Sequence, residues 1–199
     1  GGDNETDAGF EGLMREATKD DPDVLFSLYA DAGCIGAIRA RVALGLTVPT
    51  LSTAICGSKE VLDVVGDDAV GWNFLAVGSP SETPAAKEAE AILERGGGDL
   101  KLPSLGLGAL SMTLVMTLGR VANAVAAAGA EVTGASIRDR LATATDLRTF
   151  PGGSPLACGS VAAYPSVCSF EFPVGEYVAG GTVRTIPGFE AVSVIDYLP

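Results

Sequence analysis

The sequence predicts an α/β protein whose first part forms a parallel sheet. Three observations lead to this fold class. A short, nearly continuous apolar run occupies residues 24–28 and is typical of a strand in a parallel sheet. Residues 48–52 and 72–77 are interpreted as two further strands, although Pro49 is unfavourable within a strand. A segment with helical spacing lies between each successive pair of runs, and the connections are short. A β-α-β-α-β series of this kind forms parallel strands joined by right-handed crossovers.

The composition fits a folded chain with a sizeable core. Of its 199 residues, 47% are hydrophobic and 19% are charged, which excludes a disordered chain and allows one core or two small lobes. The formal net charge is −12. Nucleic acid is therefore not an expected partner, because phosphate neutralisation needs clustered lysine and arginine. We expect the acidic surface to serve solubility.

Helices are expected before and between the strands. A short amphipathic helix at 9–18 precedes the first strand, which we expect to be buried on both faces. In the helix at 33–45 the apolar stripe is formed by Ile35, Ile38 and Val42. Arg39 and Arg41 lie off this stripe. Ser58 is expected to cap the next helix. Its inward side chains are Val61, Leu62 and Val65.

A different composition follows the third strand, which opens on Trp72, a residue we expect in the core. Residues 83–95 form a charged helix. Residues 102–119 carry no charge and are apolar all round, which fits either a membrane span or a buried helix. We favour the buried helix because prolines and glycines break the run and Arg120 interrupts its continuation.

A last helix is expected to begin at Thr133 or Ser136, with its apolar side chains inward: Ile137, Leu141 and Ala144. No strand is predicted between residues 83 and 147, so these helices need a partner surface, which we expect in sequence outside this chain. Beyond a loop at 150–155, residues 168–177 are expected to form one strand. That strand turns at Gly180–Gly181 and pairs with residues 182–186 as a hairpin.

The four cysteines fall into two local pairs, Cys34 with Cys56 and Cys158 with Cys168. Three connectivities are open to four cysteines, and we favour the local one. Closing the loop at 158–168 would stabilise the fold by about 3 kcal/mol in the chain-entropy model, and such bonds indicate an oxidising compartment. The alternative is four free thiols in a cytosolic protein. A metal site is not expected, because the chain has no CxxC motif and no histidine.

Four stretches of the chain are informative when they are taken in order. They are 21–46 with its Asp21-Pro22-Asp23 start, 56–74 with Cys56 and Val70-Gly71-Trp72, the alanine-rich 107–129, and 150–168 with Phe150-Pro151-Gly152. Together they resemble the branched-chain amino acid ABC transporter family of substrate-binding proteins, in particular actinobacterial members. The resemblance implies the type I periplasmic-binding-protein fold, an α/β fold of two three-layer αβα lobes, only partly covered by this chain.

The resemblance also implies a division of the chain between the lobes. Residues 1–78 would belong to the second lobe, 79–147 would be helices completing the first lobe, and 148–199 would return to the second lobe with a disulfide loop and a hairpin. The sheet of the first lobe would come from a missing N-terminal half of the same protein. A signal peptide is not found in this chain, which opens Gly1-Gly2-Asp3.

The implied function is that of an extracytoplasmic solute-binding protein of an ABC importer, either periplasmic or a cell-surface lipoprotein. It would bind a small polar ligand, an amino acid or a related compound, between its lobes and deliver it to the membrane permease. A sensor or receptor ectodomain of the same fold is the alternative. We expect no enzyme and no cofactor, because a chain without histidine excludes Ser-His and Cys-His catalysis and Gly96-Gly97-Gly98 lacks the ending of a phosphate loop.

Open parallel sheets bind ligands beyond the carboxyl ends of their strands, which here are followed by Tyr29, Ala30 and Asp31 and by Thr53 and Ala54. Tyr29 offers an aromatic wall, Asp31 an acceptor for an ammonium, and Thr53 a small polar group. The alternative for Asp31, which we slightly favour, is the helix N-cap. Amino-acid-binding relatives carry an acid after the second strand, and Ala54 stands there in this sequence. The ligand therefore either lacks an ammonium or is held by Asp31.

Overall fold

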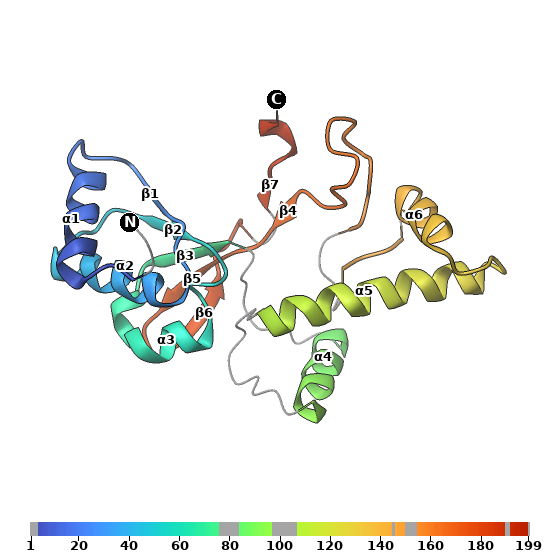
Figure 1. Ribbon diagram of the computed structural model, residues 1–199, viewed down its shortest axis with the longest axis horizontal. Coiled ribbons are helices and arrows are strands. Elements are labelled where there is room, and N and C mark those ends of the chain that lie inside the picture. The colour runs from blue at the N-terminus through green and yellow to red at the C-terminus, as the bar shows by residue number, and fades with distance from the viewer. Residues whose placement is uncertain are drawn as a thin grey trace. The chain divides into compact units, whose positions relative to one another are not determined.

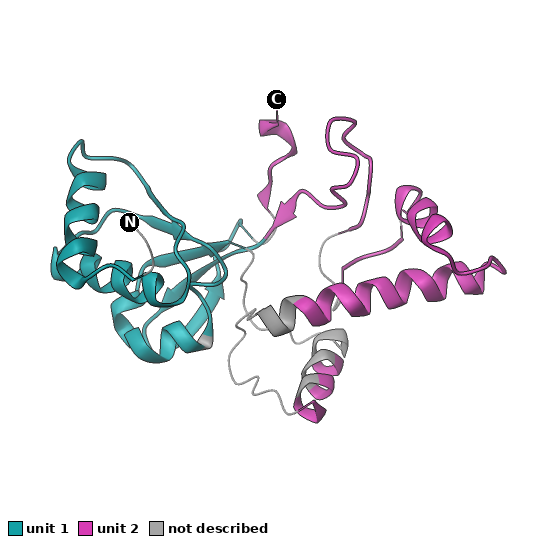
Figure 2. Ribbon diagram, viewed as in Figure 1, with its two compact units in different colours: residues 1–80, 99–107, 173–190 teal, residues 81–98, 108–172, 191–199 magenta. Residues whose placement is uncertain are grey.

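The computed structural model of the chain describes residues 4–75, 84–96, 107–144, 146–149, 155–189 and 192–198. The chain forms two compact units, which Figure 2 shows in separate colours. Unit 1 comprises residues 1–80, 99–107 and 173–190, and unit 2 comprises residues 81–98, 108–172 and 191–199. Several predicted features lie outside the described residues, namely the end of the third strand at 76–77, the start of the apolar stretch at 102–106 and most of the loop at 150–155.

Unit 1 contains a five-stranded sheet in the order β1-β2-β3-β5-β6 (Figure 1). Its strands are β1 (Leu25–Ser27), β2 (Thr50–Ser52), β3 (Trp72–Leu75), β5 (Val174–Val178) and β6 (Thr182–Thr185). The first three run parallel, β5 is antiparallel to β3, and β6 is antiparallel to β5. The predicted parallel series and the hairpin are confirmed, and Gly180 and Gly181 at its turn both have positive φ.

Three helices of unit 1 are α1 (Asp7–Thr18), α2 (Asp31–Ala43) and α3 (Lys59–Val65), the last followed by a 3-10 turn. The Thr6 hydroxyl accepts from the Gly9 N–H at 3.1 Å and so caps α1. The Ser58 hydroxyl accepts from the Val61 N–H at 3.4 Å, which confirms the predicted cap of α3. The three side chains predicted to point inward from α3 are all buried.

The core of unit 1 lies on one face of the parallel strands. The register aligns Leu25 with Thr50 and Trp72, and these side chains are buried together with the next aligned set, Ser27, Ser52 and Phe74. The alternate residues of β1 and its flanks point the other way. Val24, Phe26 and Leu28 are 56%, 54% and 69% exposed. The expectation of a strand buried on both faces is therefore wrong for β1, because the described helices cover only one face. Trp72 is fully buried, as predicted.

The buried stripe of α2 differs from the predicted one. Ile38 is fully buried, but Val42 is 47% exposed, and Arg41 occupies the inward position instead. Its guanidinium donates through Nε and Nη2 to the Val48 carbonyl at 3.4 and 3.3 Å, and through Nη1 to the Val70 carbonyl at 3.5 Å. Burial lowers the pKa of Arg41 from its ordinary value. The apolar spacing of α2 does not predict this arrangement, because the buried charge is satisfied by carbonyls at the amino ends of two strands.

α1 packs closely on α2 at a glycine. Phe10 is buried against Gly36, and a Cβ placed on Gly36 would overlap the Phe10 ring. The contact therefore requires the absence of a side chain at this position of α2. Gly12 on α1 has open space around the position of a Cβ.

These two glycines give a matched pair of variants. We expect Gly36→Ala to lower the free energy of unfolding by about 1–3 kcal/mol, because the methyl group displaces Phe10 and overpacks the contact. Gly12→Ala should raise it by up to about 1 kcal/mol, since alanine is the better helix former. Urea unfolding followed by circular dichroism measures both. A Gly36→Ala variant as stable as Gly12→Ala would contradict the close packing.

Unit 2 contains the helices α4 (Pro84–Arg95), α5 (Leu107–Ala127) and α6 (Gly134–Ala142) and a small sheet of β4 (Glu171–Phe172) and β7 (Val192–Ser193). Thr133 caps α6 in a capping box with Ser136, as its predicted start requires. The strand expected at 168–177 is instead two strands in different sheets. They separate at Pro173, which has no N–H to continue a ladder.

The long helix α5 is not the buried helix that its composition predicts. Val121 and Val125 are buried, whereas Leu114, Val115 and Leu118 are 63%, 68% and 52% exposed. The described part of unit 2 has no large sheet on which this face could pack. None of the helices in the described ranges combines the length and apolar character that crossing a membrane requires.

Both predicted disulfides are present. Cys34 pairs with Cys56 at a Cα–Cα distance of 5.2 Å, and Cys158 pairs with Cys168 at 3.7 Å. The first lies within unit 1 and the second within unit 2. Of the segment predicted to return to the second lobe, residues 173–190 belong to unit 1, and residues 148–172 and 191–199 belong to unit 2. The assignment of the units to lobes stays a prediction.

Candidate functional site

The pairing of β1 with β2 determines where the predicted site residues lie. The two strands are parallel, and Ser27 at the end of β1 is aligned with Ser52 at the end of β2. The Ser52 hydroxyl donates to the Ser27 carbonyl at 2.9 Å, which ties the strand ends together. Tyr29 follows one end and Thr53 the other, so the structure brings the two predicted loops to the same edge of the sheet.

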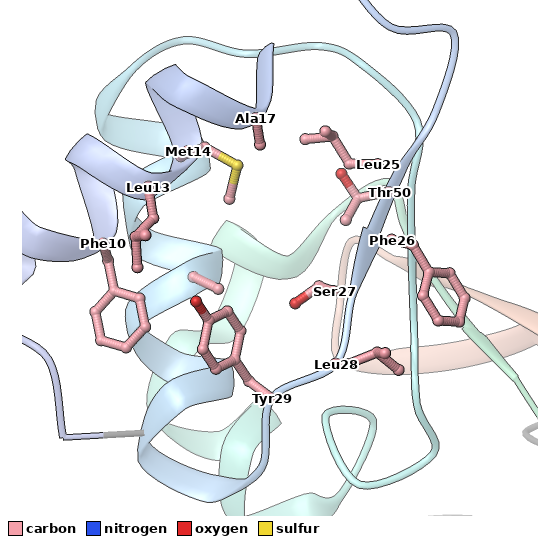
Figure 3. A pocket seen from close by; sticks show the side chains of 11 residues that line it. Phe10, Leu13, Met14, Ala17, Leu25, Phe26, Ser27, Leu28, Tyr29 and Thr50 are labelled. Carbon is pink, nitrogen blue, oxygen red and sulfur yellow. The ribbon is translucent and has the colours of Figure 1, made fainter. Parts of the chain in front are cut away.

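Tyr29 is half-buried and packs on α1. Its ring meets the Phe10 ring edge to face, with centroids 5.4 Å apart and an interplanar angle of 77°. Figure 3 shows the two rings beside each other at one end of a cavity between α1 and β1. The predicted aromatic wall is therefore present, and the contact with α1 fixes its orientation.

Ala30 and Asp31 form the start of α2. Ala30 is the N-cap, with extended φ and ψ of −129° and 155° and no hydrogen bond from a capping side chain. Asp31 is the first helical residue, is exposed, and has a φ of +40°. The alternative that Asp31 is the N-cap of α2 is therefore wrong, because Ala30 is the N-cap and Asp31 follows it. A helix start without a side-chain cap presents N–H groups and the positive end of the helix dipole, which favour an anionic group.

Thr53 carries an unpartnered polar atom. Its Oγ1 is buried and has no hydrogen-bond partner among the described residues, in contrast to the bonded hydroxyl of Ser52. Ser27 Oγ and Trp72 Nε1 share this property. Buried hydroxyls are ordinarily paired, so a buried hydroxyl without a described partner at a strand end is a candidate ligand contact. Ala54, the neighbouring predicted site residue, is half-buried against the core.

The cavity between α1 and β1 is not predicted by the sequence. It has a volume of about 370 Å³ and a mostly apolar lining that includes Phe10, Met14 and Leu25 (Figure 3). Of the five predicted site residues, Tyr29 lines it, and the other four do not. The only signal in the sequence is the apolar face of α1, which reads as ordinary core. Within the described ranges no group of three or more acidic or cysteine residues is placed to hold a metal ion.

The two neighbouring hydroxyls should respond oppositely to removal. Thr53→Val keeps the side-chain shape and removes an unpaired hydroxyl, so we expect the free energy of unfolding to stay equal or rise by about 1 kcal/mol. Ser52→Ala removes a bonded hydroxyl and should lower it by about 1 kcal/mol. Thermal unfolding of the two variants, without added ligand, measures this difference. A loss of stability in Thr53→Val would mean that its hydroxyl is paired.

Comparison with known proteins identifies the fold of the chain through solved structures of low sequence identity. No family model and no curated protein matches the chain. Solved structures match at 13% to 21% identity. A branched-chain amino acid ABC transporter protein from Thermus thermophilus, solved with bound valine, is 13% identical over 92% of this chain and 49% of its own, with a TM-score of 0.62.

Two further structures are similar to the same extent. A leucine-binding protein from Thermotoga maritima is 19% identical over 95% of this chain and 49% of its own, with a TM-score of 0.64. A solute-binding protein of an ABC transporter from Rhodopseudomonas palustris HaA2, in complex with p-hydroxybenzoic acid, is 17% identical over 96% of this chain and 50% of its own, with a TM-score of 0.67. The chain therefore has the predicted type I periplasmic-binding-protein fold and spans about half the length of these structures.

Proposed function

We propose that this chain is part of an extracytoplasmic solute-binding protein of an ABC importer and forms one wall of a site for a small carboxylic acid. One observation carries the proposal. The start of α2, which has no side-chain cap, and the Thr53 hydroxyl, which has no partner in the described part of the chain, lie at the same carboxyl edge of a parallel sheet, where this class of fold binds ligands. The partner that receives the ligand would be the permease of the importer in the membrane.

The structural neighbours support the ligand class. One was solved with valine, one with benzoate and one with p-hydroxybenzoic acid, and another belongs to a fatty acid transporter. Valine, benzoate, p-hydroxybenzoate and fatty acids differ in size and polarity but share a carboxylate. A carboxylate matches the two donors proposed for this wall, namely the N–H groups at the start of α2 and the Thr53 hydroxyl.

The site residues favour an acid that lacks an α-ammonium group. Thr53 and Ala54 follow β2, and neither can neutralise an ammonium. Asp31 is the one carboxylate among the five site residues, and its side chain is exposed at the start of α2. Tyr29 would provide an aromatic surface against the body of the ligand. An amino acid ligand would require Asp31 to hold its ammonium.

The proposed mechanism is closure of two lobes around the ligand, without a chemical step. Unit 1 presents the loops after β1 and β2, and the facing wall would come from the other lobe. Ligand contacts made on both walls stabilise the closed form, which is a hinge transition of the kind two-lobed binding proteins use. The permease would then distinguish the closed form from the open one.

A thermal-shift screen of the full-length protein tests the ligand class. The panel is benzoate, 4-hydroxybenzoate, octanoate, L-valine and L-leucine, with benzamide and L-valinamide as counterparts that lack the carboxylate. We expect at least one acid to raise the melting temperature with the logarithm of its concentration, and its amide to have no effect. A shift by L-amino acids alone would assign the ammonium to Asp31, and Asp31→Asn should then abolish it. No shift from any acid, or turnover of a bound acid, would contradict the proposal.

Binding affinity tests the role of Thr53. In the full-length protein we expect Thr53→Val to weaken binding of the selected acid about five- to tenfold, because a hydrogen bond worth about 1 kcal/mol or slightly more is lost. Thr47→Val is the matched control, since Thr47 is exposed before β2, at the opposite end of the strand. Isothermal titration calorimetry measures both. Equal affinity in the two variants would remove Thr53 from the site.

A further inference from the structure

We infer that the Cys34–Cys56 disulfide is a positioning device that holds the loops after β1 and β2 in the arrangement the ligand site needs. The consequence for binding rests on the proposed function, whereas the restraint on the loops does not. Both cysteines are fully buried, and their Cα atoms are 5.2 Å apart. Buried sulfurs are shielded from thiols in solution, which makes this bond a permanent restraint and not a redox switch.

Each cysteine lies one hydrogen-bonded turn away from a site residue. Cys34 is the fourth residue of α2, and its N–H donates to the Ala30 carbonyl at 3.4 Å. Cys56 ends the turn that begins at Thr53, and its N–H donates to the Thr53 carbonyl at 3.2 Å. Cys56 Sγ also lies 3.5 Å from the Tyr29 carbonyl oxygen. The disulfide therefore joins the turn at Ala30 to the turn at Thr53 covalently.

The two loops hold features that a relaxed backbone would not keep. Asp31 has a φ of +40°, the N-cap Ala30 provides no capping side chain, and the Thr53 hydroxyl is buried without a partner among the residues that the structure describes. Each of these is unfavourable and would be relieved by a local rearrangement. β1 and β2 are only three residues long, so their ladder restrains the loops over a short distance. A covalent tie between the loops opposes that rearrangement and keeps the donors in place for a ligand.

The second disulfide provides a matched control. Cys158 and Cys168 are separated by ten residues and close a local loop in unit 2, away from the predicted site residues in sequence and in their assigned unit. Removing it changes the same number of sulfur atoms and also releases a loop. Neither of its cysteines belongs to unit 1, which carries the loops after β1 and β2.

Hydrogen–deuterium exchange of the full-length protein tests the restraint without any ligand. We expect the C34A/C56A variant to exchange the amides of residues 30–34 and 53–57 at least tenfold faster than the wild type, with α3 and β3 little changed. C158A/C168A should leave both loops unchanged. Uniform acceleration across unit 1 would overturn the inference, because the bond would then act on global stability alone. Unchanged loops would overturn it as well.

If C34A/C56A folds poorly, a second variant and a measurement on the wild type still test the inference. C34A/C56V refills part of the volume of the removed sulfur atoms and should show the same loop acceleration. In the wild type, the amides of Cys34, Cys56 and Gly57 should exchange as slowly as those of β2. Fast exchange of these three amides in the wild type would overturn the inference whether or not either variant folds.

Calorimetry then tests the consequence for binding, with 4-hydroxybenzoate and L-valine as probes. We expect the affinity for the probe that binds the wild type to fall at least fivefold in C34A/C56A and to stay within twofold in C158A/C168A. Faster loops with unchanged affinity would overturn the positioning role. If neither probe binds the wild type, the proposed carboxylate site fails for these ligands, and the exchange measurement alone decides whether the bond restrains the loops.

Discussion

The parallel pairing of β1 with β2 is the constraint from which the other features of unit 1 follow. Because the register aligns Ser27 with Ser52, both strands end at the same height, and the chain must leave the sheet there twice, side by side. The first exit leads into α2 and the second into the turn before α3. The uncapped helix start, the buried Thr53 hydroxyl and the Cys34–Cys56 bond are all found at this edge. A shift of one residue in the pairing would place opposite faces of the strands against α2.

The sequence was sufficient for features that depend on local pattern. Ser58 and Thr133 were recognisable as caps, the parallel series followed from three apolar runs, and both disulfides joined the cysteines nearest in sequence. The sequence was insufficient for features that depend on contacts with residues far away along the chain. Arg41 is buried because two strand carbonyls accept from it, and the exposed face of α5 depends on what else is present to cover it. The spacing of apolar residues along a helix reveals neither the hydrogen-bond partners of a charged side chain nor the surface that covers an apolar face.

For the candidate site, too, some features could be predicted from the sequence and others could not. Topology alone located Tyr29, Ala30, Asp31, Thr53 and Ala54 at the strand ends, because parallel strands must present their carboxyl ends together. The conformation at each position was not accessible from the sequence. That Asp31 has a positive φ, that Ala30 is the N-cap and that the Thr53 hydroxyl has no described partner are properties of the packed backbone. They change which groups are available to a ligand while the set of residues stays the same.

Arg41 has a consequence for how the interior of unit 1 responds to a change of pH. It is the one charged side chain that is buried among the described residues, and backbone carbonyls satisfy it in place of a carboxylate. Carbonyls do not titrate, a guanidinium stays protonated in proteins, and the chain has no histidine. No buried acid has to lose or gain a proton to keep this charge satisfied. This buried charge therefore stays satisfied in mildly acidic and in mildly alkaline surroundings.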